Sequence, residues 1–196
     1  MRQNFTNYAF TESVKKAQEK YGSRDLYARM DTNGPDQYQL FQRETAHIEK
    51  MDGFYLSTVG DNGWPYVQFR GGPKGFVRVL DNETIGYADF RGNKQYISTG
   101  NLTASNKAAM IFLDYTTKTR LKIWAEASIL DPEEHPELRH QLALPDYQAK
   151  IERLMIFRVK AFDWNCPQHI TPKFTIAEMK SRMQSDPGFH QMVMEG

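Results

Sequence analysis

The stretch from Phe54 to Arg70, FYLSTVGDNGWPYVQFR, decides the fold. Two runs of strand-forming residues, FYLSTV and YVQFR, flank the segment GDNGWP. The sequence Asp-Asn-Gly readily supplies the positive φ angles of a tight turn, and such a turn between two strand-like runs is typical of a β-hairpin. The stretch therefore predicts two antiparallel strands joined by a short turn.

Similar runs follow along the chain. GFVRVL (75–80) and ETIGYADF (83–90) flank a second Asp-Asn turn, and AAMIFLDY (108–115) and RLKIWAEASIL (120–130) flank TTKT. LMIFRVKAFDW (154–164) is a last long run. Strands that are joined by hairpins form meanders or barrels rather than βαβ sheets. We therefore predict roughly seven strands in a closed or split antiparallel β-barrel, a mainly β fold with helices (α+β).

Helical patterns lie on either side of these strands. TESVKKAQEKYG (11–22) begins with Thr11, a helix-capping residue, and ends with Gly22, and LFQRETAHIEKM (40–51) carries an apolar face. The segment from Pro132 to Pro145 predicts a helix whose first turn holds two glutamates. RGNKQYISTGNLTASN (91–106) predicts a loop with one helical turn, and TIAEMKSRMQ (175–184) a tail helix.

The domain organisation follows from these patterns. We expect one domain over residues 1–196, because this length suits a single core. Residues 1–52 would form a helical N-terminal extension, 53–165 the barrel, and 166–196 a C-terminal segment with its helix.

Composition excludes several classes of protein. With 25 Lys+Arg against 24 Asp+Glu, the net charge of +1 gives no general attraction to nucleic acid or to anionic membranes. The mean hydropathy is −0.67, and no apolar run approaches the ~18 residues of a spanning helix. The first ten residues lack the apolar core of a secretory signal. The single cysteine, Cys166, fits a reducing compartment, so we expect a cytoplasmic protein.

Two glycine-rich turns carry cations. RGGPKG (70–75) matches no common nucleotide-binding loop and fits a β-turn, but Arg70 ends a strand there and can reach an anion. In DFRGNKQ (89–95), Arg91 and Lys94 flank Gly92-Asn93. Exposed backbone N–H groups between two cations can hold a phosphate, whereas the alternative is a solvated turn. The sequence thus offers a phosphate site without requiring one.

The stretch WNCPQHITP contains a Cys-x-x-His pair, Cys166 and His169. A structural zinc needs four ligands, and no other histidine pair has suitable spacing, so we expect no metal. An aromatic ring, an amide, a thiol and an imidazole this close together suggest a ligand wall. The alternative is a strand corner in which Trp164 packs in the core.

Taken together, these residues resemble the pyridoxamine 5′-phosphate oxidase-like family of FMN-binding split barrels, in a subgroup other than the true oxidase. The likeness rests on the stretch 53–130, including VQFRGG and DFRGNK, and on 157–174, including DWNCPQHITPKF. It implies a homodimer of six-stranded split barrels with FMN bound between the subunits. The oxidase's substrate-binding Arg and His pattern near the C-terminus is not matched, so pyridoxamine phosphate is not expected as substrate.

The resemblance also implies roles for individual residues. The strand beside the flavin corresponds to Gln68, Phe69 and Arg70, and the phosphate turn corresponds to Asp89, Arg91, Gly92, Asn93 and Lys94. Lys94 matches the phosphate-binding lysine, while Asn93 replaces an arginine. Arg120 falls where the oxidase directs a glutamine at the flavin, and Trp164, Gln168 and His169 would approach from the partner subunit.

The function that the resemblance implies is that of an FMN-dependent oxidoreductase. Its substrate would be a small organic molecule, with NAD(P)H or oxygen as the redox partner and His169 as the catalytic proton donor. Two alternatives stay open: a flavin-binding or flavin-sensing module without turnover, and a haem-handling split barrel.

Overall fold

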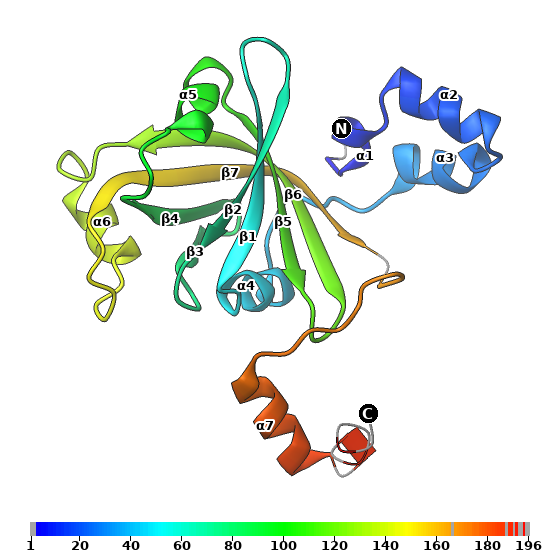
Figure 1. Ribbon diagram of the computed structural model, residues 1–196. Coiled ribbons are helices and arrows are strands. Elements are labelled where there is room, and N and C mark those ends of the chain that lie inside the picture. The colour runs from blue at the N-terminus through cyan, green and yellow to red at the C-terminus, as the bar shows by residue number, and fades with distance from the viewer. Residues whose placement is uncertain (1–2, 166, 187, 190, 192–193, 195–196) are drawn as a thin grey trace.

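The computed structural model describes residues 3–165, 167–186, 188–189, 191 and 194 (Figure 1). Within these residues one antiparallel sheet of seven strands has the order β2-β1-β5-β6-β7-β4-β3. The strands are β1 (Gly53–Val59), β2 (Pro65–Gly71), β3 (Val77–Asp81), β4 (Thr84–Phe90), β5 (Lys107–Asp114), β6 (Thr119–Leu130) and β7 (Ile151–Asn165).

The sheet curls without closing, because β2 and β3 remain its two edges (Figure 1). This confirms the mainly β architecture with helices and the split barrel. The described strands number one more than the six that the resemblance implied.

The first hairpin has the predicted form. Its register runs from Gly53 opposite Gly71 to Val59 opposite Pro65. Gly63 adopts φ of 80° in the turn, a conformation that is strained for other residues. The hairpin is therefore a local product of its own sequence.

The core lies inside the curled sheet. Alternate residues of the central strands point inward and are at most 1% exposed: Phe54, Leu56, Met110, Phe112, Leu121 and Ile123. Burial of each such side chain contributes about 2 kcal/mol. Strand alternation thus sends one set of side chains to the core and leaves the other for surfaces.

Among the residues that the structure describes, four helices precede the sheet: α1 (Thr6–Ala9), α2 (Glu12–Lys20), α3 (Arg24–Asn33) and α4 (Gln42–Glu49). The patterns predicted α2, where the Thr11 side chain caps Val14 N, and α4, where Ile48 is fully buried. They did not separate out α3, whose Leu26 is 72% exposed, because it lacks a continuous apolar stripe.

Two later helices differ from their predicted limits. The helix α5 (Ile97–Ala104) follows β4 and is longer than the single turn expected. The helix α6 begins at Pro136 rather than Pro132 and ends at Leu142. The residue before a proline disfavours helical geometry, so His135, with φ of −129°, separates the helix from the preceding turn.

The predicted tail helix is present as α7 (Ile176–Ser185), which is capped by Thr175 and lies below the barrel (Figure 1). In the described part of the chain, none of the helices combines the length and the apolar character needed to cross a bilayer.

Candidate functional site

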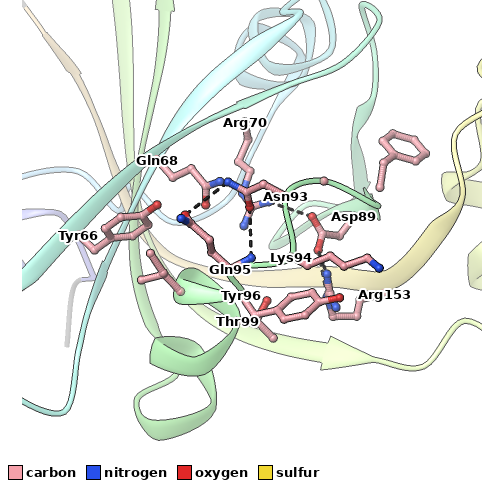
Figure 2. A pocket seen from close by; sticks show the side chains of 13 residues that line it. Tyr66, Gln68, Arg70, Asp89, Asn93, Lys94, Gln95, Tyr96, Thr99 and Arg153 are labelled. Carbon is pink, nitrogen blue, oxygen red and sulfur yellow. Dashed lines mark hydrogen bonds and ion pairs between the residues drawn. The ribbon is translucent and has the colours of Figure 1, made fainter.

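A pocket of about 240 Å³ lies where β2, the end of β4 and the start of α5 meet (Figure 2). It holds six of the residues predicted for the cofactor site: Gln68, Arg70, Asp89, Gly92, Asn93 and Lys94. Its other lining residues are Tyr66, Phe90, Gln95, Tyr96, Ile97, Thr99 and Arg153. The structure thus brings together two segments whose nearest pocket residues, Arg70 and Asp89, are 19 positions apart in the sequence.

The strand β2 supplies one wall through alternate residues. Tyr66, Gln68 and Arg70 face the pocket and are partly buried, whereas Val67 and Phe69 between them are exposed. The Ser98 hydroxyl of α5 donates to Gln68 Oε1 at 3.0 Å. This bond fixes the amide group of Gln68 at the pocket wall.

Asp89 links two arginines at the base of the pocket (Figure 2). Its carboxylate accepts from Arg70 Nη1 at 3.0 Å and from Arg153 Nε and Nη2 at 3.0 and 2.6 Å. Burial disfavours the charge of Arg153, but its bonds to Asp89 and the charge of Glu152 keep the Arg153 pKa above its ordinary value. Asp89 therefore holds both guanidinium groups in place.

Arg153 is the main site residue that the sequence analysis missed. It lies opposite Asp89 in the β4–β7 register, more than sixty positions away along the chain. Cross-strand pairing of this kind leaves no local motif. A charged pair, Glu152-Arg153, at the start of the apolar run LMIF is the one available signal.

The charge of the pocket suits a dianion. Arg70, Lys94 and Arg153 contribute three positive charges and Asp89 one negative charge, which leaves a net +2 among the lining residues. The Arg70 Nε is buried and has no hydrogen-bond partner among the residues that the structure describes. A phosphate oxygen is a suitable acceptor for such a donor, so the residues present fit the phosphate of FMN.

The loop between β4 and α5 has an unusual backbone. Lys94 and Tyr96 adopt φ of 60° and 53°, a left-handed conformation that costs of order 1 kcal/mol in a residue other than glycine. Such conformations point successive N–H groups in one direction, as in anion-binding nests. The first turn of α5 also lines the pocket, through Ile97 and Thr99, and leaves N–H groups without helical partners.

Arg91 lies outside this pocket. Its Nε donates to Glu152 at 2.9 Å, and together they line a neighbouring hollow. The hydrogen bond from Arg91 and the nearby Arg153 lower the pKa of Glu152. Glu152 also accepts from the Tyr96 hydroxyl, while Arg153 lies over the Tyr96 ring at 4.8 Å. These interactions hold Tyr96, and with it the loop between β4 and α5, against β7.

The remaining predicted residues lie away from the pocket within the same chain. Phe69 is on the opposite face of β2. Arg120 is near the β5–β6 turn, at the end of the sheet opposite α5 (Figure 1). Gln168 and His169 are exposed in the turn after β7. Cys166 lies outside the described residues.

Trp164 packs at that far end against α4. Its indole N–H donates to Glu44 Oε1 at 2.8 Å, its ring meets His47 edge-on at 4.8 Å, and Arg43 lies over it at 4.1 Å. Burial lowers the pKa of His47, against a hydrogen bond with the Phe112 carbonyl. Within one chain Trp164 therefore packs at a corner between β7 and α4, and its place beside a partner subunit's flavin stays a prediction.

The family model for pyridoxamine 5′-phosphate oxidase matches residues 40–165, well over half of the chain. The chain belongs to this family. The matched region begins just before α4 and ends with β7, so it includes every strand and the whole pocket. No curated protein sequence matches the chain.

Solved structures share this family member's fold at low sequence identity. A candidate pyridoxamine 5′-phosphate oxidase from Lactobacillus delbrueckii is 17% identical, with a TM-score of 0.51 over 65% of this chain and 96% of that one. An FMN-binding protein from Syntrophomonas wolfei is 18% identical, with a TM-score of 0.49 over 79% and 96%. HupZ from Group A Streptococcus is 15% identical, with a TM-score of 0.49 over 69% and 99%. The likeness to the Lactobacillus protein supports the fold assignment alone.

Proposed function

We propose that this family member binds FMN with its phosphate in the pocket between β2 and α5. The observation that carries the proposal is the paired arginines around Asp89, with an unpartnered Arg70 Nε and a net +2 charge. A phosphate dianion at this position would be held by charge-assisted hydrogen bonds, each worth about 1.5–3 kcal/mol. Lys94 and the first turn of α5 would complete the phosphate site.

The edge position of β2 would serve the rest of the cofactor. Because β2 pairs only with β1, the backbone groups on its other side are not used by the described sheet. N–H and C=O groups along residues 68–70 could therefore bond the polar edge of a flavin, and the Gln68 amide a ribityl hydroxyl. When bound, FMN would supply redox chemistry that no side chain offers.

The outer face of β2, β1 and β5 would pair with a second copy of the chain. Its apolar side chains are exposed: Val67 by 59%, Phe69 by 57%, Val59 by 46%, and Tyr55 and Ile111 by 37% each. Tyr55 lies opposite both Phe69 and Ile111, so these side chains form one patch. Exposed apolar patches of this kind mark interfaces. A twofold dimer would create two equal sites.

As the family resemblance implies, the second copy would bring Arg120, Trp164, Gln168 and His169 toward the flavin. His169 would then give or take a proton beside the ring, with a small organic substrate and NAD(P)H or oxygen completing an oxidoreductase. The alternative function, a flavin-binding module without turnover, would use the same pocket. No histidine that the structure describes lines the pocket, so the geometry of one chain favours flavin over haem.

The test compares FMN with riboflavin in fluorescence titrations of the whole protein. We expect FMN to bind at least a hundredfold more tightly, because riboflavin lacks the phosphate. Lys94→Gln should weaken FMN binding about tenfold and leave riboflavin unchanged. The matched control is Lys16→Gln on the exposed surface of α2. Equal affinities of the two flavins for the unaltered protein would refute the phosphate assignment.

A further inference from the structure

A groove of about 600 Å³ lies between the turn of the β1–β2 hairpin and the helix α5. Tyr66, Tyr96 and Ile97 line both this groove and the phosphate pocket, so the two hollows meet at these residues. We call it the hairpin–α5 groove, and its other lining residues are Gly60, Asp61, Asn62, Trp64, Pro65, Gly100 and Asn101. The phosphate pocket therefore continues into a larger hollow on the side of the hairpin turn.

Large apolar side chains are exposed around this groove. Trp64 is 74% exposed, Tyr96 44% and Ile97 40%. The backbone of Trp64 is held on both sides, because its N–H donates to Asn62 Oδ1 at 3.1 Å and its carbonyl accepts from Gly60 N at 3.0 Å. Exposed apolar side chains that gather at a hollow are typical of ligand sites, and a flat indole suits the stacking of a planar heterocycle.

The charge of the groove differs from that of the phosphate pocket. None of its lining residues that the structure describes is a lysine, an arginine or a histidine, and Asp61 adds one carboxylate. A further phosphate or a tail of carboxylates would therefore meet no cation in the groove. The part of a ligand that lies there should be uncharged.

Two amide side chains give the groove specific hydrogen-bonding atoms. Asn62 Oδ1 accepts from Trp64 N, and Asn101 Nδ2 donates to Thr58 Oγ1 at 3.0 Å. Within the described residues, Asn62 Nδ2 and Asn101 Oδ1 have no partner, which leaves one donor and one acceptor. The edge of an adenine base offers the complementary acceptor and donor, and a carboxylate such as Asp61 can accept from a ribose hydroxyl.

We propose that the hairpin–α5 groove binds an uncharged nucleoside that is joined to the flavin through its phosphate, as the adenosine of FAD is. The proposal rests on the proposed phosphate site, because FAD consists of FMN extended at its phosphate by an AMP unit. The net +2 charge of the phosphate pocket would face the two negative charges of a pyrophosphate, the same total as in the FMN phosphate. Charge therefore suits both cofactors, and the groove distinguishes them through stacking on Trp64.

The test compares FAD with FMN by isothermal titration calorimetry of the whole protein. We expect FAD to bind about tenfold more tightly, the size of effect typical of one stacked base. Trp64→Ala should lower the FAD affinity to that of FMN and leave the FMN affinity unchanged. Gly100→Leu should do the same by filling the groove, since a Cβ at Gly100 meets no atom within 4 Å. Tyr21→Ala, an aromatic residue 78% exposed at the end of α2, is the matched control.

A second arm tests the nucleoside without a flavin. ADP carries the adenosine and a pyrophosphate, whereas inorganic pyrophosphate lacks the adenosine. We expect ADP to displace FMN at about tenfold lower concentration than inorganic pyrophosphate does. Trp64→Ala should remove this difference.

The outcomes separate this inference from the proposed function. If FMN and FAD bind equally tightly, the groove holds no nucleoside, while the proposed phosphate site stands. A preference for FAD that persists in Trp64→Ala, or an equal loss of both flavins in that variant, also overturns the inference. Binding of FAD alone would support the groove and refute FMN as the cofactor. If neither flavin binds, the phosphate site is wrong and both proposals fail.

Discussion

The two faces of β2 differ in chemistry although their residues alternate along one short strand. Tyr66, Gln68 and Arg70 face inward to a charged pocket, where Arg70 is held by Asp89. Val67 and Phe69 face outward, more than half exposed, and carry no charge. A single strand can therefore serve a ligand with one face and a partner with the other.

Two glycines next to Phe69 fix the position of its ring on the outer face. A Cβ on Gly53 would lie 2.2 Å from the Phe69 ring, and one on Gly71 would lie 2.9 Å from it. The exposed Phe69 ring thus rests on bare backbone and has a defined position. An aromatic ring held in one place and exposed on an outer face is typical of interface anchors.

The largest effect is expected on the inner face. Arg70→Ala should weaken FMN binding at least a hundredfold, because it removes charge-assisted bonds to the phosphate. It should also lower the free energy of unfolding by about 2 kcal/mol, since buried Asp89 loses one partner. Titration and thermal melting measure the two effects. Arg158→Ala, an exposed β7 arginine, is the control, and an equal effect there would contradict the role of Arg70.

A substitution on the outer face should change dimer formation rather than the folding of the chain. Val67→Asp places a charge in the proposed interface and should weaken the dimer about a hundredfold, while the isolated chain keeps its fold. Light scattering after gel filtration reports the mass. Ile176→Asp, at the start of α7, changes an even more exposed side chain and should leave the mass unaltered. A monomeric unaltered protein that still binds flavin would refute the dimer.

Arg91 and Arg153 both bond to Glu152. Comparing variants of the two tests whether the sequence or the structure identifies the phosphate ligand correctly. Arg153 lines the pocket, whereas Arg91 is bonded to Glu152 outside it. We expect Arg153→Gln to weaken FMN binding ten- to thirtyfold, and more than Arg91→Gln does. Both are measured by flavin fluorescence. The opposite ranking would mean that the loop rearranges to bring Arg91 to the phosphate.

At the far end of the sheet, His169→Ala tests whether the dimer completes the site. It should leave FMN affinity unchanged and slow turnover with NADH or NADPH about tenfold, a barrier increase of ~1.4 kcal/mol. Stopped-flow absorbance follows the rate. Loss of FMN would make His169 a structural residue, and no change in either quantity would place it outside the site.

The smallest effect concerns His47. Because its pKa is lowered in the folded chain, the unfolded chain takes up the proton first as the pH falls below about 6.5. His47 therefore contributes less stability at pH 5.5 than at pH 7.5. The stability gap between the unaltered protein and His47→Gln should narrow over that range in thermal melts. A gap that widens on acidification would contradict the direction of the shift.

The sequence predicts those parts of the molecule that depend on neighbouring residues. The first hairpin follows from its Asn-Gly turn, and the start of α2 from its Thr11 cap. The glycine-rich loop with Lys94 also reaches the pocket as expected. In each case the deciding interaction lies within a few positions of the chain.

Features set by tertiary register could not be found in this way. Arg153 meets Asp89 only because β4 and β7 pair with that register. The strand alternation that turns Phe69 away from Gln68 and Arg70 was readable in principle, but the resemblance assigned all three to the flavin. The length of α5 depends on packing of Leu102, since its sequence has little helical preference.

The link between Arg70 and Asp89 has a further consequence for how the barrel opens. Along β1 and β5 the strands are joined by backbone ladders, whereas β2 meets β4 through side-chain charges. A seam of this kind can separate without breaking the sheet, so amide protons of β2 should exchange with solvent faster than those of β6. A phosphate bound to the same arginines would slow that exchange. Ligand entry would then require the same local separation of β2 from β4 that exposes these amides.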